Sequence, residues 1–169
     1  KGIKEFVEAA TILKDKGIDA WFVLVGEGDI ENPSVVPIKQ LQYWANEGVI
    51  EWWGREDDMP SILAQANIVC LPSFYGEGVP KVLIEAASCG RPIVTTNTPG
   101  CKEIVKHNVN GFLVPIRDSY AVAEAIGTLI NSPDLRNKMG LKGRMLVKKE
   151  FSLEQVNQET LSVYRDLFH

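Results

Sequence analysis

Hydrophobic residues follow two different spacings in the first part of the chain. Over residues 3–13 they recur every three or four positions, and Gly17 follows, which predicts an amphipathic helix that stops at this glycine. Residues 20–25, AWFVLV, form an unbroken apolar run of strand length that closes in Gly26-Glu27-Gly28. Such a run is typical of a buried parallel strand, and the loops that follow these strands bind ligands.

The alternation of helix and strand patterns continues to residue 114. Further helices are predicted at residues 33–47, 59–66, 80–89 and 102–106, and further strands at residues 49–53, 67–71, 92–96 and 111–114. Short apolar strands separated by helices imply right-handed crossovers, which place the strands in a parallel sheet with helices on both faces. The predicted fold class is α/β, with a doubly wound, Rossmann-like sheet.

Residues 118–169 carry helical patterns alone. Asp118 is placed to cap a first helix, Ser132-Pro133 opens a second, and Ser152-Leu153-Glu154-Gln155 is a capping-box pattern for a third. We therefore divide the chain into a sheet region at residues 1–117 and a helical tail at residues 118–169 of the same domain.

The composition is that of an ordinary globular domain, with 45% hydrophobic and 24% charged residues. A formal charge of −4 argues against a general binder of nucleic acid or of anionic membranes, because such proteins need a broad basic surface. Any bound anion must therefore be held locally.

Cysteine usage and the ends of the sequence indicate the compartment. Cys70, Cys89 and Cys101 show no C-x-x-C spacing and are expected to be reduced thiols of a cytosolic protein. No apolar run reaches the length of a membrane span, and no signal peptide opens the sequence. Because the sequence starts at Lys1 and enters a helix at once, we expect it to be cut from a longer protein.

The segment 72–100 concentrates the residues that suggest a ligand site. Gly76 and Gly78 flank Glu77 in a loop that lets the backbone approach a ligand, and Pro80 suits a first helical position. The start of a helix favours an anion such as a diphosphate, through its free amides and its dipole. The amides expected to point outward there belong to Val79, Lys81 and Val82.

Glu85 lies in the same predicted helix among Leu83, Ile84, Ala86 and Ala87. An ionised carboxylate in such surroundings is costly unless it is hydrogen-bonded, and a ribose diol would be a suitable partner. The spacing of Lys81 and Glu85 also fits a plain surface ion pair of a helix, and one glycine-rich loop before a helix is a weak signal. The residues alone leave both interpretations open.

Several motifs of this sequence occur together and in the same order in one known family. EGVPKVLIE, with Glu77 and Glu85 eight residues apart, is followed by AASCGRPIVTT and then by PGCKEIV. Four further segments complete the series: LVGEG at residues 24–28, VIEWWG at residues 49–54, LPS at residues 71–73 and NGFLV at residues 110–114. The sequence thereby resembles glycosyltransferase family 4 (glycosyl transferases group 1), retaining enzymes with the GT-B fold. The resemblance covers the C-terminal, donor-binding domain and nothing of the N-terminal acceptor domain.

This resemblance implies roles for particular residues. Glu85 would bind the ribose hydroxyls of the nucleotide, and Glu77 would approach the transferred sugar. Lys1, which precedes Gly2, would neutralise the leaving diphosphate. The arginine that usually lies a few residues earlier, together with the strand that carries it, falls outside the sequence.

The resemblance also assigns the walls of the donor crevice. Backbone groups at Gly54-Arg55 would read the base beside Ile62 or Leu63, and Gly26 with the loop from Asn97 to Gly100 would complete the crevice. Arg55 is either a phosphate ligand or an ordinary surface arginine.

Taken together, the resemblance implies a donor-binding domain that is inactive alone. The full-length protein would transfer a sugar from a nucleoside-diphosphate sugar, with UDP as the carrier by family majority, to a glycan or polyprenyl-diphosphate-linked acceptor in bacterial surface polysaccharide synthesis. We expect no cofactor and no metal, since D-x-D is missing and Asp57-Asp58 fit a polar turn. The enzyme would be cytoplasmic, with peripheral membrane association of the full-length protein and no nucleic-acid partner.

Two other functions fit parts of the pattern. A nucleotide-sugar 2-epimerase shares the GT-B architecture and also binds UDP in its C-terminal domain, although its usual histidine-bearing site is not evident in this sequence. A non-enzymatic nucleotide- or phosphate-binding module is the other alternative, because a fold does not fix a function. Such a module would need no joint role for Glu77 and Glu85.

Overall fold

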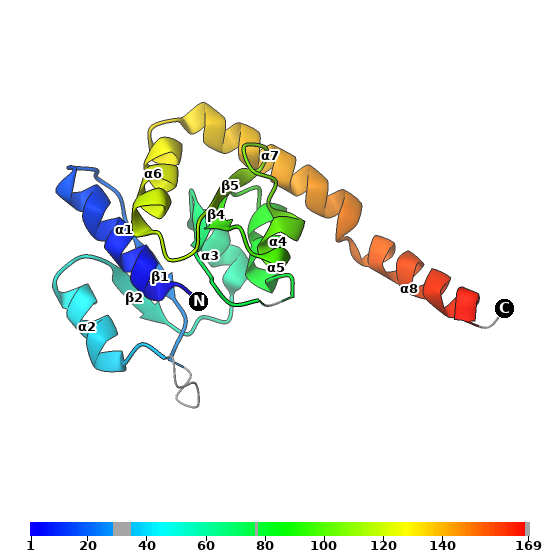
Figure 1. The fold of residues 1–169 in the computed structure, drawn as a ribbon, viewed down its shortest axis with the longest axis horizontal. Coiled ribbons are helices and arrows are strands. Elements are labelled where there is room, and N and C mark those ends of the chain that lie inside the picture. The colour runs from blue at the N-terminus through cyan, green and yellow to red at the C-terminus, as the bar shows by residue number, and fades with distance from the viewer. Residues whose placement is uncertain (29–34, 77, 168–169) are drawn as a thin grey trace.

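The computed structural model describes residues 1–28, 35–76 and 78–167. Helices and strands alternate in the predicted order, and helices alone follow (Figure 1). The strands are β1 (Val23–Val25), β2 (Glu51–Gly54), β3 (Val69–Leu71), β4 (Ile93–Thr96) and β5 (Gly111–Val114). The helices are α1 (Ile3–Asp15), α2 (Ile38–Asn46), α3 (Met59–Gln65), α4 (Lys81–Ser88), α5 (Pro99–Ile104), α6 (Ser119–Ile130), α7 (Pro133–Glu150) and α8 (Leu153–Leu167).

Every strand pair in the described residues is parallel, as predicted. The strands form two sheets rather than one, with the orders β1-β2 and β3-β4-β5. β4, in the centre of its sheet, is fully buried, whereas β1 and β3 are only half-buried. Within the described residues, no strand pairs with both β1 and β3 to join the two sheets.

The start of α1 is pinned to the end of β3. Gly2 has a left-handed backbone, with φ +81°, and a Cβ added to it would lie 2.1 Å from the carbonyl oxygen of Pro72. Only glycine permits this approach. Lys1 therefore lies at the carboxyl end of the second sheet, where the loops that follow the strands gather.

Two hydrophobic clusters lie on the two sides of β4. Val94 belongs to the cluster that α1 and α6 cover, whereas its neighbour Ile93 belongs to the cluster that α3, α4 and α5 cover. Successive residues of a strand point to opposite faces, so the helices cover both faces of this sheet. This arrangement confirms the predicted doubly wound α/β fold.

The helical tail forms as predicted, and its first two helices pack onto the sheet region. The Asp118 carboxylate accepts a hydrogen bond from the Ala121 amide at 2.9 Å, and the Ser152 hydroxyl accepts one from the Gln155 amide at 3.2 Å. α6 packs against α1, and α7 packs against α4. α8 instead projects away from the rest of the chain (Figure 1).

Helix α5 corrects one predicted boundary. The sequence pattern places a loop at Asn97–Gly100 and a helix at residues 102–106, whereas the helix begins at Pro99 and ends at Ile104. Thr98 is extended, and the fixed φ of proline suits the first turn of a helix. Gly100 is therefore a buried helical residue, and not part of a loop.

Candidate functional site

The first turn of α4 presents free backbone donors. Pro80 is extended, with φ −66° and ψ 121°, so it is the N-cap residue and not the first helical residue as predicted. The first intrahelical bond runs from the Leu83 amide to the Pro80 carbonyl at 3.0 Å, and no side chain of the described residues caps the helix. The amides of Lys81 and Val82 precede that bond and remain available to an anion.

Glu85 occupies a different environment from the predicted one. Its side chain is 29% exposed rather than buried, and its carboxylate lies 3.3 Å from the Lys81 ammonium, which is 89% exposed. The surface ion pair that the spacing allowed is thus formed. Because solvent screens such a pair, it contributes only a few tenths of a kcal/mol at most and does not keep Glu85 from a competing hydroxyl donor.

Gly26 and Gly54 come together at the ends of β1 and β2. The Gly26 amide donates to the Gly54 carbonyl at 2.6 Å, and the Trp52 indole donates to the Gly26 carbonyl at 2.8 Å. Gly26 has φ +130°, a backbone conformation that L side chains rarely adopt. These two predicted residues therefore meet where β1 and β2 end, Gly54 as the last residue of β2 and Gly26 directly after β1.

Arg55 follows directly and is held by two carboxylates. Its guanidinium lies 3.5 Å from Glu27 and 3.4 Å from Asp57, and its side chain is 70% exposed. The next carboxylate, Asp58, caps α3, and hydrogen bonds from the Ser61 hydroxyl and amide lower its pKa. Two carboxylates offset the charge of Arg55, and its side chain is exposed, as is usual for a surface arginine. Its role as a phosphate ligand remains a prediction.

The ends of β3 and β4 hold a buried polar cluster that sequence reasoning missed. The Thr95 hydroxyl donates to the Leu71 carbonyl at 2.6 Å, and the Thr96 hydroxyl donates to the Ser73 carbonyl. Ser73 is only 2% exposed, and its own hydroxyl has no hydrogen-bond partner among the described residues. Hydroxyl residues at the carboxyl ends of two apolar strands were the available signal.

A cation also reaches this region from the loop after β5. The Arg117 guanidinium lies 5.0 Å from the centre of the Phe74 ring, and Phe74 stacks on Tyr75 with ring centres 4.9 Å apart. This contact joins the loop after β5 to the loop after β3. Arg117 was not predicted, since only the order of strands in the sheet brings the two loops together.

The predicted site residues that the structure describes thus lie around the carboxyl ends of the strands, a region that we call the carboxyl edge. Lys1, Gly78, Lys81 and Asn97 are exposed there, and Val79 and Val82 are half-buried. The Asn97 amide donates to the Val114 carbonyl at 3.0 Å. Glu77 lies outside the described residues.

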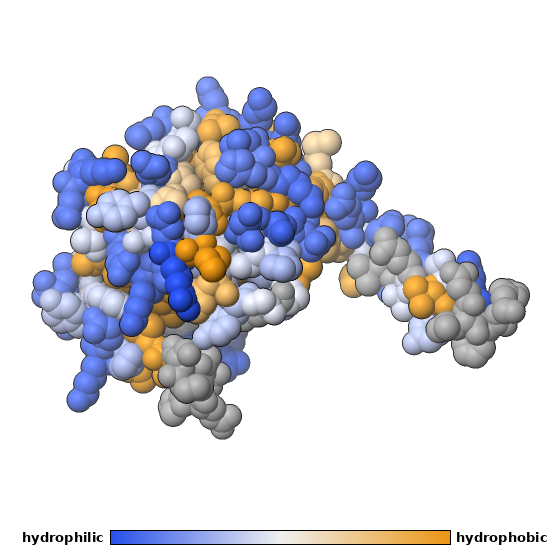
Figure 2. Space-filling view, in the orientation of Figure 1, coloured by the Kyte–Doolittle hydropathy of each residue, from blue (hydrophilic) through white to orange (hydrophobic). Residues whose placement is uncertain are grey.

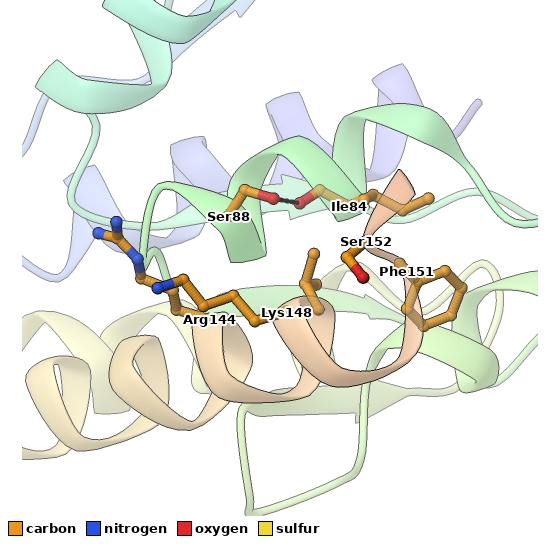
Figure 3. Close-up of a pocket in the computed structure, with 7 residues that line it drawn as sticks. Ile84, Ser88, Arg144, Lys148, Phe151 and Ser152 are labelled. Atoms are coloured by element: carbon orange, nitrogen blue, oxygen red, sulfur yellow. Dashed lines mark hydrogen bonds between the residues drawn. The ribbon is translucent and has the colours of Figure 1, made fainter. Parts of the chain in front are cut away.

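Two grooves of the described residues lie away from the carboxyl edge. A groove of about 300 Å³ runs between α4 and α7, as Figure 3 shows, and a second of about 210 Å³ lies beside Trp21 and Glu51. Neither groove is lined by a predicted site residue.

Neither a Cys70 thiolate nor a grouped set of metal ligands is found in the described residues. Burial raises the pKa of the Cys70 thiol to about 12, so this thiol stays protonated at neutral pH. In the part of the chain that the structure describes, no three His, Cys, Asp or Glu side chains are grouped as a metal site requires. The same part contains no helix that is long and apolar enough to span a membrane.

The pattern of motifs extends along most of the sequence. Residues 1–145 match the family described as glycosyl transferases group 1. This chain belongs to that family. The match confirms the group 1 membership that the motifs indicated, and some relatives are named for the biosynthesis of bacterial polysaccharides.

Curated group 1 relatives are similar over most of this chain. In Campylobacter jejuni, N,N'-diacetylbacillosaminyl-diphospho-undecaprenol alpha-1,3-N-acetylgalactosaminyltransferase is 38% identical over 136 residues, which are 80% of this chain and 34% of the relative. The capsular polysaccharide biosynthesis glycosyltransferase CapM of Staphylococcus aureus is 32% identical over 97% of this chain and 42% of its own length. The chain spans less than half the length of these relatives.

Solved structures share the fold. HepE of Anabaena, solved with UDP, superposes with a TM-score of 0.88 at 24% identity over 98% of this chain and 45% of its own. The C-terminal domain of a group 1 protein from Francisella tularensis superposes with a TM-score of 0.75 at 24% identity, over 90% of this chain and 80% of its own. The α/β fold is therefore that of the C-terminal domain of GT-B glycosyltransferases.

Proposed function

We propose that this chain is the donor-binding domain of a retaining, family 4 glycosyltransferase. The enzyme transfers a sugar from a UDP-sugar to a glycan or polyprenyl-diphosphate-linked acceptor in bacterial surface polysaccharide synthesis. The observation that carries the proposal is the uncapped start of α4 at the carboxyl edge, with Glu85 one turn further along the same helix. A helix start that binds an anion, with a carboxylate one turn away that accepts hydrogen bonds from hydroxyl groups, suits a nucleoside diphosphate.

The proposed chemistry depends on stabilising a leaving diphosphate. As the bond from the anomeric carbon to the diphosphate oxygen breaks, negative charge grows on the leaving group, and preorganised donors lower the barrier. The amides of Lys81 and Val82 and the ammonium of Lys1 supply that stabilisation, and no metal takes part. Glu77 positions the transferred sugar.

Glu85 then accepts hydrogen bonds from the ribose hydroxyls. Its carboxylate needs only to leave the exposed Lys81 ammonium, 3.3 Å away, to do so. Once released, the lysine side chain is free to approach the adjacent phosphates. One weak ion pair is thereby exchanged for charge-assisted hydrogen bonds to the nucleotide, each about twice as strong as a neutral one.

The remainder of the full-length enzyme supplies the acceptor site. We propose that it also supplies a strand between β1 and β3, ahead of Lys1, with the arginine that the family carries there. The half-buried edges of β1 and β3 and the contact of Gly2 with Pro72 support this position. The enzyme works at the cytoplasmic face of the membrane, where a polyprenyl-linked acceptor is held; the acceptor named for the Campylobacter jejuni relative contains undecaprenol diphosphate.

Titration calorimetry with UDP, GDP and UDP-sugars tests the donor site. The wild-type chain is expected to bind UDP, and Glu85→Ala to bind it about tenfold more weakly or worse, because a charged hydrogen bond is lost. Glu124→Ala, at an exposed glutamate of α6, is the matched control and should bind as the wild type does. Equal affinities of wild type and Glu85→Ala, or no binding by either, contradict the proposal.

Transfer itself is assayed with the full-length protein. Activity is expected to persist in EDTA, and complete loss on chelation would contradict a metal-free mechanism. Interconversion of the free nucleotide sugar at C2, without transfer, would instead identify the epimerase alternative.

A further inference from the structure

Charge is distributed unevenly in this acidic chain. α7 contains six basic and two acidic residues, a formal charge of +4, whereas the whole chain carries −4 and the rest of it therefore −8. The basic residues of α7 are Arg136, Lys138, Lys142, Arg144, Lys148 and Lys149. The net charge that argued against an anionic surface as partner thus conceals one strongly basic helix.

One side of α7 is fixed tightly to the body of the domain. Met139, Gly140, Gly143 and Val147 are buried, and a Cβ added to Gly140 would lie 1.9 Å from the carbonyl oxygen of Gly90. Backbone thus meets backbone at the end of α4. The helix is held in one orientation, and its opposite side faces solvent.

One of the six basic side chains is used inside the fold. Arg136 donates to the carbonyls of Leu129 and Ile130 at 2.6 and 2.7 Å, where it satisfies the end of α6. The other five are exposed, and none of them forms an ion pair with a carboxylate of the described residues. Their charge is therefore available to an external anion.

Two large apolar side chains lie among these cations. Leu141 is 66% exposed and Met145 is 71% exposed, and they are one helical turn apart. We call the exposed side of α7 the basic face; it consists of Lys138, Leu141, Lys142, Arg144, Met145, Lys148 and Lys149. In Figure 2 hydrophilic side chains, with apolar ones between them, crowd the upper edge of the molecule over α7.

The groove between α4 and α7 borders the basic face. Arg144 and Lys148 lie along it, and Ile84 and Phe151 line it (Figure 3). The Ser88 hydroxyl in the groove already donates to the Ile84 carbonyl at 2.8 Å, and the two cations supply the positive charge of the groove. Apolar walls beside two cations suit a phosphate group that is attached to hydrocarbon.

We propose that the basic face docks onto the anionic surface of a lipid bilayer. Each lysine or arginine close to such a surface is attracted by its negative potential, and exposed Leu and Met side chains enter the interfacial layer. The apolar pair in the middle of the basic face favours lipid over nucleic acid, which binds cations without needing apolar contacts. The choice of a bilayer as partner rests on the lipid-linked acceptor of the proposed function.

Sedimentation with vesicles tests the docking. The wild-type chain is expected to sediment with vesicles of phosphatidylcholine and phosphatidylglycerol, and not with vesicles of phosphatidylcholine alone. Lys142→Glu/Lys149→Glu should weaken this binding at least about tenfold, because two attractions become repulsions. Lys16→Glu/Lys39→Glu changes the net charge equally at exposed lysines of other elements and should bind as the wild type does.

Two further measurements keep the proposal separate from the donor site. Leu141→Ser/Met145→Ser should bind the anionic vesicles less well than the wild type while its charge is unchanged. Lys142→Glu/Lys149→Glu should bind UDP as tightly as the wild type does. Loss of vesicle binding together with normal UDP binding would support docking through the basic face. This conclusion does not depend on how tightly Glu85→Ala binds UDP.

Three results would overturn the docking. They are equal vesicle binding by Lys142→Glu/Lys149→Glu and the wild type, equal binding to neutral and anionic vesicles, and binding of duplex DNA in place of vesicles.

Discussion

The carboxyl edge and the basic face are both suited to anions, but they use different groups. At the start of α4 the donors are backbone amides, and the nearby cations are paired, Lys81 with Glu85 and Arg55 with Glu27. On α7 the backbone donors of the helix interior are used within the helix, and five exposed side chains supply the charge. Directional donors fix one small ligand in place, whereas spread charge attracts a surface.

This difference determines how each region responds to its surroundings. Amides at a helix start act over short distances and depend on geometry, while exposed side-chain charges act over about a Debye length and are screened by salt. The net charge of the chain describes neither region. Substitutions and salt therefore separate the two.

The largest effect is expected where the two helices meet. Gly140→Ala places a methyl group 1.9 Å from the Gly90 carbonyl oxygen, so α7 must move away from α4, and the free energy of unfolding should fall by about 2 kcal/mol. Urea denaturation measures it. Gly143→Ala on the same helix is the control, since its Cβ would lie at an ordinary 3.6 Å from its neighbours. Equal stability of the two variants would contradict the close contact.

Salt is the next most informative variable. A tenfold rise in KCl concentration is expected to weaken binding to anionic vesicles by about tenfold or more, because the Debye length shortens around the basic face. UDP affinity should change by less than about threefold, because backbone amides supply most of its donors. Parallel titrations measure both. A UDP affinity that falls as steeply as vesicle binding would show that the two regions bind anions in the same way.

Within the carboxyl edge, the buried hydroxyls of Ser73 and Thr96 should differ. Thr96→Val removes a hydrogen bond to the Ser73 carbonyl and should cost about 1 kcal/mol of stability. Ser73→Ala removes a buried hydroxyl that has no partner among the described residues and should cost nothing, or stabilise the fold slightly. Thermal unfolding compares them, and a larger loss for Ser73→Ala would show that its hydroxyl has a partner after all.

The smallest effect is expected for the ion pair of α4. Lys81→Ala breaks an exposed pair and should lower the free energy of unfolding by only about 0.3 kcal/mol. Chemical denaturation with closely spaced points can resolve that change. A loss above about 1 kcal/mol would mean that the pair holds α4 in place rather than yielding Glu85 to a ligand.

Periodicity predicted the helices and strands because each buries one face or both. It placed the strand at Gly111–Val114 at its observed bounds and misplaced the start of α5 by reading Pro99-Gly100 as a turn. The fixed φ of proline allowed Pro80 to be either the N-cap residue or the first helical residue. Its extended backbone, with ψ 121°, shows that it is the N-cap residue. The two-part sheet was not predictable from a pattern that names strands but not their neighbours.

The candidate site was predictable where it lies within one segment. The spacing of Lys81 and Glu85 allowed both an ion pair and a ribose contact, and the structure shows the pair. The contacts of Arg117 with Phe74 and of Thr96 with Ser73 join separate loops. Such contacts depend on strand order, which hydrophobic spacing does not encode.

The meeting of Gly90 and Gly140 has a consequence for geometry at a membrane. Since no side chain separates the two helices at that point, we expect α4 and α7 to move together. A bilayer that holds α7 would therefore also set the tilt of α4 and the height of its first turn above the lipid headgroups. The distance that a lipid-linked acceptor must bridge would then be fixed by the packing of two glycines.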